Sequence, residues 1–282
     1  MPNQINPNLT KIQKAVMFEN STEKPFSGEY DHHFENGLYV CQNCGKGLYY
    51  SQNKFDSRCG WPAFETAVSE SVRQKIDSDG RRTEILCNNC GVHLGHVFVG
   101  EMLTDTNTRH CVNSASLDFV GGQNLESVVV GCGCFWGVQY WFQKLTGVVI
   151  CEVGYTGGSP NPSYKEVCRG STGHREVLRV IFDKTKISYR QIIEYFFEIH
   201  DFEQVGGQGA DIGEQYESVI LVKNQTEKDQ ITEIITILKA KNYQVATQIL
   251  DETAFWKGED YHQNYYHKNG STPYCHFHKK IF

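Results

Sequence analysis

The chain has 282 residues and a hydrophobic fraction of 39%, which is enough for two domains that each bury a core. No stretch reaches the roughly 18 consecutive apolar residues of a membrane span, and the polar start from Met1 to Thr10 does not resemble a signal peptide, so we expect a cytoplasmic protein without membrane contacts. The net charge of −6 argues against a nucleic-acid-binding protein, and eleven cysteines indicate metal or redox chemistry rather than structural disulfides.

Residues 1–37 are polar and mixed, and we expect them to wrap around the first domain before its first strand. Two short apolar strands then lead into similar Cys-x-x-Cys-Gly turns. Because two thiolates of such a turn can bind one tetrahedral ion, the pair of turns predicts a zinc site. The alternative is two redox dithiols, which is less favoured because one redox couple needs only one such turn. The four expected ligands are Cys41, Cys44, Cys87 and Cys90.

A second group of polar residues in the first half surrounds a thiol. The segment 109–113 reads Arg-His-Cys-Val-Asn, and alternate residues of an extended chain share a face. Arg109, Cys111 and Asn113 therefore point the same way, and Arg109 would favour the thiolate of Cys111. The nearby His93 and His96 are able to protonate a bound group, although a single histidine is more often a hydrogen-bonded structural residue.

The segment 121–126 is the expected linker, because its first residues are Gly-Gly-Gln-Asn without an apolar pattern. Beyond it, Ser188 and Gln191 form a capping box at the start of a helix. The order of elements is that of a ferredoxin-like α+β domain, extended by a helix over 227–241 and a closing segment through Leu250. The expected strands cover 126–131, 148–155, 177–182 and 218–222, and the expected helices cover 135–145 and 189–199.

The segment from Gly131 to Gly137 reads Gly-Cys-Gly-Cys-Phe-Trp-Gly and joins the first of these strands to the first helix. Cys134 lies where the first helical amides are unpaired and the helix dipole favours a negative charge. We therefore expect a nucleophilic thiol with a pKa below the roughly 8.5 of a free cysteine. The alternative is a small buried cysteine ahead of two core aromatic residues.

Four polar side chains from the loops of the second half are expected to gather around Cys134, because strand ends and loops meet at one edge of a sheet. Two phenols and a carboxyl beside the aromatic wall of Phe135 and Trp136 would suit a ligand with a small apolar end and an oxygen atom. Taken one at a time, the aspartate could instead be an ordinary turn residue, and each tyrosine could be a core residue whose hydroxyl is hydrogen-bonded. The four residues are Tyr164, Glu176, Asp211 and Tyr216.

These motifs resemble the two types of methionine sulfoxide reductase. Residues from about 9 to 119 are similar to the B type through the two cysteine turns and through segments 59–62, 93–98 and 109–114. Residues from about 127 to 282 resemble the A type through segments 133–137, 154–158, 173–176, 208–216 and 259–263. The resemblance implies a bifunctional enzyme, with a mainly β B-type domain at 1–120 that reduces the R epimer and an A-type domain at 127–282 that reduces the S epimer.

For the second domain the resemblance implies that Cys134 attacks the sulfoxide sulfur and becomes a sulfenic acid. Protonated Glu176 and two phenols would bind and protonate the oxygen, since a carboxyl beside aromatic rings has a raised pKa. The aromatic wall would hold the methyl group, and the aspartate would order the loop of one tyrosine. The implied substrate-binding residues are Phe135, Trp136, Tyr164, Asp211 and Tyr216.

For the first domain the resemblance implies that Cys111 is the nucleophile, that Arg109 supports its thiolate and that Trp61 forms part of a methyl pocket. The oxygen of the sulfoxide would be met by three further side chains. These are His93, His96 and Asn113.

Turnover requires a second thiol that converts each sulfenic acid into a disulfide. The resemblance implies Cys59 for the first domain and Cys275 for the second, with thioredoxin as the reductant of both disulfides and no organic cofactor. Cys275 lies in the segment 269–279, which we expect to be mobile enough to reach Cys134. Irregularly spaced histidines near this segment are expected to be solvated rather than metal ligands; they are His262, His267, His276 and His278.

Two alternatives belong to other functional classes. In the first, the zinc-bearing half is a partner-binding module without chemistry, tethered to a single A-type reductase domain. The Arg109 to Asn113 segment and the additional thiol of Cys59 argue against it, because a binding module needs neither. In the second, the protein exchanges disulfides in other proteins, with Cys132 and Cys134 as the only close pair at the nucleophile.

Overall fold

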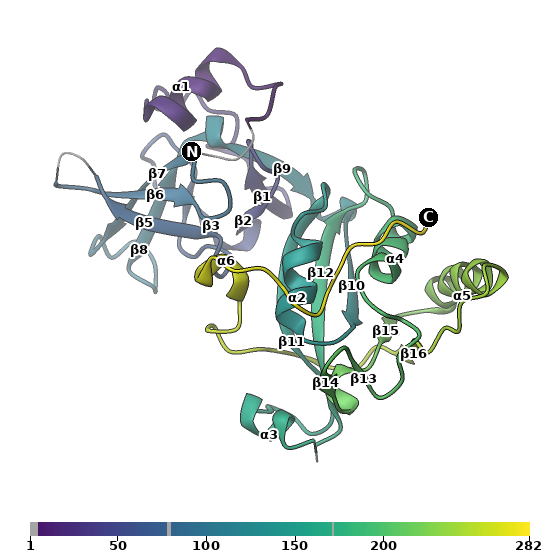
Figure 1. The fold of residues 1–282 in the computed structure, drawn as a ribbon. Helices are drawn as coiled ribbons and strands as arrows, with labels where there is room; N and C mark the ends of the chain where they lie inside the picture. The colour runs from purple at the N-terminus through teal and green to yellow at the C-terminus, as the bar shows by residue number, and fades with distance from the viewer. Residues whose placement is uncertain (1–4, 78–79, 171) are drawn as a thin grey trace. The chain divides into compact units, whose positions relative to one another are not determined.

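The computed structural model describes residues 5–77, 80–170 and 172–282. The chain divides into two compact units, Met1–Leu125 and Glu126–Phe282 (Figure 1). A single turn of 3-10 helix, η3 (Gly122–Asn124), lies between the last strand of the first unit and the first strand of the second, in the segment expected to be a linker. Within the described residues, no helix is both long and apolar enough to cross a membrane.

The first unit is built mainly from two antiparallel sheets. Their inward-facing aromatic and aliphatic side chains form one core that includes Tyr39, Tyr49 and Phe64. One sheet has the order β2-β1-β9, from β1 (Gly37–Cys41), β2 (Gly47–Tyr50) and β9 (Leu117–Gly121). The other has the order β3-β4-β8-β7-β6-β5, from β3 (Lys54–Phe55), β4 (Ala63–Phe64), β5 (Val72–Ile76), β6 (Thr83–Cys87), β7 (His93–Val99) and β8 (Thr108–Val112).

The segment 1–37, expected to wrap around the domain ahead of its first strand, contains helix α1 (Lys11–Glu19) among its described residues. Thr10 and Gln13 make a capping box at its N-terminus, which satisfies two otherwise unpaired amides. The helix buries Val16 and Met17. The helix is short, and its few apolar residues give a weak periodic signal, so its existence depends on this cap and this packing.

The second unit contains a six-stranded sheet of order β16-β15-β10-β12-β11-β17. β10 pairs with β15, and β11 with both β12 and β17, in antiparallel fashion, whereas β15 and β16 pair in parallel. The principal core lies between this sheet and three helices that bring apolar residues to it, α2 (Phe135–Phe142), α4 (Tyr189–Glu198) and α5 (Gln225–Ala240). The strands are β10 (Leu125–Gly131), β11 (Val148–Gly157), β12 (His174–Asp183), β15 (Val219–Val222), β16 (Gln248–Asp251) and β17 (Phe255–Lys257).

The predicted strands and helices of the second half are confirmed, including the capping box of Ser188 and Gln191 at the start of α4. Several short elements were not predicted, because they have fewer than six residues and no measurable period. They are α3 (Tyr164–Cys168), β13 (Gly207–Gln208), β14 (Asp211–Ile212), η4 (Glu214–Tyr216), β17 and α6 (Tyr265–Asn269).

Candidate active sites and metal centre

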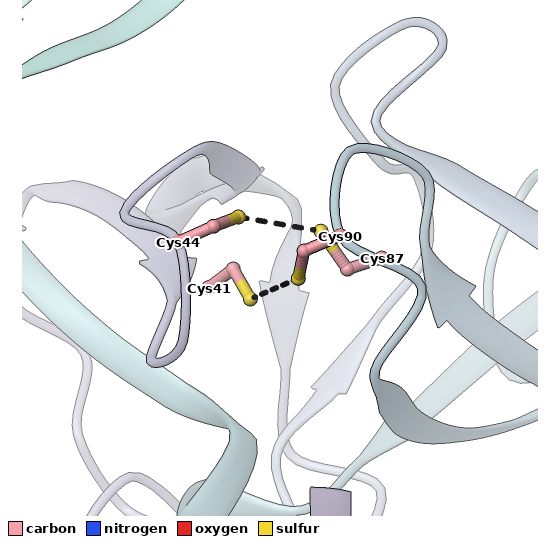
Figure 2. A group of neighbouring side chains, drawn as sticks. All are labelled: Cys41, Cys44, Cys87 and Cys90. Atoms are coloured by element: carbon pink, nitrogen blue, oxygen red, sulfur yellow. Dashed lines mark hydrogen bonds between the residues drawn. The ribbon is translucent and has the colours of Figure 1, made fainter. Parts of the chain in front are cut away.

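The four cysteines of the two Cys-x-x-Cys-Gly turns, here called knuckles, come together in the first unit, with their sulfur atoms all within 4.8 Å of one another (Figure 2). Cys41 Sγ lies 3.7 Å from Cys90 Sγ, and Cys44 Sγ lies 3.7 Å from Cys87 Sγ. Four thiolates around a zinc ion at about 2.3 Å would have sulfur atoms roughly 3.8 Å apart, so the observed spacing fits a tetrahedral zinc site.

The two knuckles have the same local structure. Gly45 and Gly91 have φ angles of +72° and +78°, which close each turn and which L-residues with side chains rarely adopt. In each knuckle the glycine amide donates to the carbonyl of the first cysteine, at 2.8 Å. Cys41 ends β1 of one sheet and Cys87 ends β6 of the other, so the cluster connects the two sheets.

A second thiol pair lies in the first unit, where Cys59 Sγ and Cys111 Sγ are 3.8 Å apart. Cys111 is on β8, paired with Ala63 of β4 on one side and with His96 of β7 on the other. Gly95 allows β7 and β8 to lie close together at Cys111, because a Cβ atom at that position would lie 2.0 Å from the Cys111 carbonyl oxygen. The geometry allows a disulfide after a small movement.

The two sulfurs of this pair differ in their electrostatic environment. Hydrogen bonds, first from Cys111 and then from Ser57, lower the pKa of Cys59 to about 5. The hydrogen bond to Cys59 and burial raise the pKa of Cys111, while Arg109 acts in the opposite direction. The hydrogen bond between the two sulfurs thus favours the negative charge on Cys59, while Arg109 lowers the pKa of both thiols.

A cavity of about 130 Å³ opens onto Cys111. Trp61, His96 and Asn113, all expected in the site, line it, and so do Phe98 and Arg82. The cavity therefore has an aromatic side and a polar side around one thiol, which suits a small ligand with an apolar group and an oxygen atom.

The two histidines expected in the first site are each held by a carboxylate that was not singled out in the sequence. His93 Nδ1 is 2.7 Å from Glu84 Oε1 in a fully buried pair, and His96 Nε2 is 2.9 Å from Asp77 Oδ2. His93 does not line the cavity; its ring lies against that of His96, with the centroids 5.5 Å apart. Arg109 is likewise fixed by two hydrogen bonds to Glu101.

In the second unit, Cys134 is the N-cap residue of α2 at the end of β10. Gly133, with φ of +97°, turns the chain there, and a Cβ atom on it would meet the Gln208 side chain at 2.7 Å. Glu176 reaches the same place because β12 lies next to β10 in the sheet. Its Oε2 accepts a hydrogen bond of 3.2 Å from the amide of Phe135, the residue after Cys134.

Glu176 is 2% exposed, and this burial raises its pKa to about 8. It is therefore largely protonated at neutral pH, as expected for an acid. The expected low pKa of Cys134 is wrong: burial, and then the charge of Glu176, raise it, and they outweigh the hydrogen bond from the Trp136 amide. Because Glu176 is largely protonated at neutral pH, burial is the main cause that keeps Cys134 a thiol.

The aromatic wall beside Cys134 is held by residues that the sequence analysis did not place in the site. The Trp136 ring stacks on that of Tyr265, with the ring centroids 3.7 Å apart, and its Nε1 donates a hydrogen bond of 3.0 Å to His262 Nδ1. Glu259 accepts from the Tyr155 hydroxyl at 2.8 Å and from the Tyr164 amide at 3.0 Å. The expectation that His262 is solvated is wrong, since it is 1% exposed.

The expected loop residues are near the same centre. Tyr164 and Tyr216 both interact electrostatically with Glu176, as the raised pKa of each phenol reflects after the larger effect of burial. Asp211 accepts a hydrogen bond of 3.4 Å from Tyr274, next to Cys275. The loop that carries Asp211 is thus connected to the C-terminal segment as well as to the site.

The C-terminal segment around Cys275, expected to be mobile, runs past α2 and α4 and makes several contacts with these helices (Figure 1). The Trp141 indole donates to the His276 carbonyl at 3.2 Å. The Glu198 carboxylate accepts from the Ile281 and Phe282 amides at 2.8 and 3.0 Å. Cys275 is half-buried and lies within electrostatic range of Cys134. Cys132, in contrast, points into the core.

Each unit thus contains a thiol beside a pocket or an acid and a second thiol within electrostatic reach, which defines a two-domain protein for cysteine redox chemistry. The sequence profile of the family "Peptide methionine sulfoxide reductase" matches residues 126–282, and that of the "SelR domain" matches residues 9–121. The chain belongs to the peptide methionine sulfoxide reductase family, with a SelR domain preceding the reductase domain of that name.

Similar proteins agree with this assignment. The chain is 42% identical over 153 residues to peptide methionine sulfoxide reductase MsrA of Sulfolobus acidocaldarius, an overlap of 54% of this chain and 87% of that protein. It is 43% identical over 157 residues to MsrA of Trichodesmium erythraeum, covering 54% and 89% of the two chains. The crystal structure of reduced Mxr1 from Saccharomyces cerevisiae matches with a TM-score of 0.54 and 32% identity, covering 56% of this chain and 94% of that one.

The protein therefore reduces methionine sulfoxide to methionine. The two reductase types act on opposite epimers at sulfur, so a chain with both serves the R epimer in its SelR domain and the S epimer in the domain that follows.

Proposed function

We propose that the two thiol centres are the two active sites, with Cys134 and Cys111 as the nucleophiles. The observation that carries the proposal is the approach of Cys59 and Cys111, whose sulfurs lie 3.8 Å apart beside a cavity with aromatic and polar walls. A purely structural pair of cysteines would need neither the cavity nor a nearby guanidinium.

In the second domain Cys134 attacks the sulfoxide sulfur while Glu176 gives its proton to the oxygen. The bond between Cys134 Sγ and the substrate sulfur forms as the S–O bond order falls. The hydroxyl then moves to Cys134 while this S–S bond and the S–O bond break, which releases methionine and leaves a sulfenic acid, and the proton of the Cys134 thiol replaces the one that Glu176 gave. Tyr164 and Tyr216 hold the oxygen, and Phe135 and Trp136 enclose the methyl group. Asp211 orders the loop of Tyr216. The raised pKa of Glu176 supports this role, because an acid must carry its proton at neutral pH.

In the first domain Cys111 performs the same attack, and Arg109 supports its thiolate. Trp61 holds the methyl group, and His96 with Asn113 meets the oxygen, since both line the cavity. His93 acts through His96, because it lies behind that ring and outside the cavity.

Each sulfenic acid is then converted into a disulfide with loss of water, by Cys59 in the first domain and by Cys275 in the second. Thioredoxin, a dithiol of low reduction potential, reduces both disulfides and restores the enzyme without an organic cofactor. The partial exposure of Cys59 and Cys275 supports this step, because the reductant must reach one residue of each pair.

We further propose that Cys41, Cys44, Cys87 and Cys90 hold a structural zinc ion. The reductase domains span 1–120 and 127–282, joined by the linker 121–126. The second domain has a ferredoxin-like core, supported by the strand order β15-β10-β12-β11 with α2 and α4 in the two crossovers. A cytoplasmic location would suit the eleven cysteines, because that environment keeps thiols reduced.

The experiment that tests the site assignment measures the reduction of separate R and S epimers of a methionine sulfoxide peptide. We expect Cys111→Ser to abolish R-epimer reduction and to spare the S epimer, and Cys134→Ser to do the reverse. Each variant is thereby the folding control of the other. If Cys111→Ser leaves R-epimer reduction intact, Cys111 is not the nucleophile and the alternative of a binding module gains support.

A further inference from the structure

The histidine that follows Cys275 is buried between two contacts. His276 is 1% exposed, although the sequence predicted it to be solvated. Its Nδ1 is 3.1 Å from Cys275 Sγ, and its Nε2 is 2.7 Å from the carbonyl oxygen of Cys132. The ring thus joins the expected resolving thiol to the strand end that carries Cys134.

These two contacts determine the tautomer of the ring. A carbonyl oxygen only accepts hydrogen bonds, so the nitrogen facing Cys132 must carry the proton. In a neutral imidazole the other nitrogen then has a free lone pair. Nδ1 therefore accepts a hydrogen bond from the Cys275 thiol, which is the arrangement of a base poised next to the proton that it removes.

Helix α2 is shaped to receive this ring. A Cβ atom on Gly137 would lie 2.3 Å from His276 Nδ1, so only glycine leaves room there. The Trp141 indole, one turn further along α2, donates to the His276 carbonyl at 3.2 Å and fixes the backbone. The orientation of the ring is therefore set by the same helix whose first residue follows the nucleophile.

Cys275 needs such a base. Burial, and then the charge of Asp211, raise its pKa to about 11, so at neutral pH it is a thiol, whereas only a thiolate attacks sulfur efficiently. His276 is available as an acceptor, because its Nδ1 lone pair faces the thiol. Burial lowers its pKa to about 4, which keeps the ring neutral but makes it a weak base, so the proton moves to Nδ1 only as the S–S bond forms. Cys275 thus carries a proton on its sulfur, and the neighbouring Nδ1 of His276 has a free lone pair that can accept it.

We propose that His276 is the general base that deprotonates Cys275 when this thiol closes the disulfide on Cys134. The inference rests on the proposed role of Cys275 as the resolving thiol. The Cys275 proton moves to Nδ1, the Cys275–Cys134 S–S bond forms, and the S–O bond of the sulfenic acid breaks. The departing hydroxide takes the proton from Nδ1 and leaves as water, which returns His276 to its neutral state.

The test follows a single turnover of the reduced full-length chain with the S epimer of a methionine sulfoxide peptide, without thioredoxin. Released methionine reports the first step, and mass spectrometry of the Cys134–Cys275 disulfide reports the second. His276→Gln retains a donor for the Cys132 carbonyl but has no basic nitrogen. We expect an unchanged rate of methionine release and disulfide closure slowed by about 100-fold or more. His267→Gln, an exposed histidine of α6, is the matched control and should change neither rate.

A second variant separates a base from a merely structural residue. His276→Ala leaves space for a small base, and added imidazole should accelerate its disulfide closure. Disulfide closure at the wild-type rate in His276→Gln would overturn the proposal, as would equal slowing of both steps or no effect of imidazole on His276→Ala. If Cys275→Ser still forms a disulfide on Cys134 at the wild-type rate, the assignment of the resolving thiol itself fails.

Discussion

The buried site of Glu176 favours the neutral form of its carboxyl group. This preference makes the free energy of unfolding depend on pH. The pKa of Glu176 is about 8 in the folded protein, because of burial, against an ordinary value of 4.5. Between these two values the folded chain binds a proton that the unfolded chain has lost, so the contribution of Glu176 to stability falls as the pH rises from about 4.5 to about 8.

Glu176→Gln keeps a neutral side chain of the same shape and removes this dependence. We predict that the free energy of unfolding of the variant, relative to the wild type, rises by about 1.4 kcal/mol per pH unit between about pH 5 and about pH 8. Urea unfolding of the full chain at several pH values measures it. A difference that does not change with pH would mean that Glu176 is charged in the folded protein and does not serve as an acid.

The same substitution tests the catalytic role of Glu176. An amide cannot give a proton to the sulfoxide oxygen, so we predict that Glu176→Gln slows S-epimer reduction by about 100-fold or more and leaves R-epimer reduction unchanged. Glu152→Gln is the matched control, since this carboxylate is paired with Arg179 instead of facing Cys134. S-epimer reduction within a few-fold of the wild type in Glu176→Gln would remove Glu176 from the mechanism.

At the scale of elements, the end of α4 holds the C-terminal segment through one carboxylate. Glu198 accepts hydrogen bonds from two terminal amides and from His278, at 3.1 Å. Because hydrogen bonds to a charged acceptor contribute about 1.5–3 kcal/mol each, we predict that Glu198→Ala accelerates hydrogen exchange of the peptide containing residues 281–282 by tenfold or more. Glu194→Ala, one turn earlier on α4 in a partly exposed pair with Arg190, should leave this exchange unchanged. Unchanged exchange in Glu198→Ala would show that other contacts hold the segment.

The long elements of this chain were predictable because each carries a local signal. The capping box of Ser188 and Gln191 and the amphipathic period behind it predict α4, and the apolar runs predict β10, β11 and β12. The two Cys-x-x-Cys-Gly turns predict a metal cluster whatever the spacing between them, since only the sulfurs need to meet.

The supporting residues of the sites were not predictable in the same way. Glu84 meets His93 across the pairing of β6 with β7, and His276 contacts the backbone of another part of the chain, so no local pattern marks either residue. The pKa of Cys134 was misjudged for a related reason. The helix N-terminus is visible in the sequence, whereas the burial that raises the pKa depends on the complete fold.

At the scale of the whole molecule, the two units use different means of stabilisation. The second unit has a large core between one sheet and three helices. The first unit has a smaller core shared between two sheets, and the cysteine cluster ties the end of β1 in one sheet to the end of β6 in the other. A metal ion there would replace core packing that a mainly β unit of this size lacks.

Removal of the proposed zinc ion should therefore unfold one unit and spare the other. Binding of structural zinc contributes roughly 10 kcal/mol or more in small zinc domains, which is comparable to the entire stability of a typical domain of about 5–15 kcal/mol. We predict that a strong chelator, or Cys44→Ser, abolishes R-epimer reduction and removes one thermal unfolding transition, while S-epimer reduction continues. Cys168→Ser, an exposed cysteine outside the cluster, is the control for loss of a thiol. Metal analysis that finds no zinc in an R-epimer-active preparation would disprove the four-cysteine assignment, because the sheets would then be joined without it.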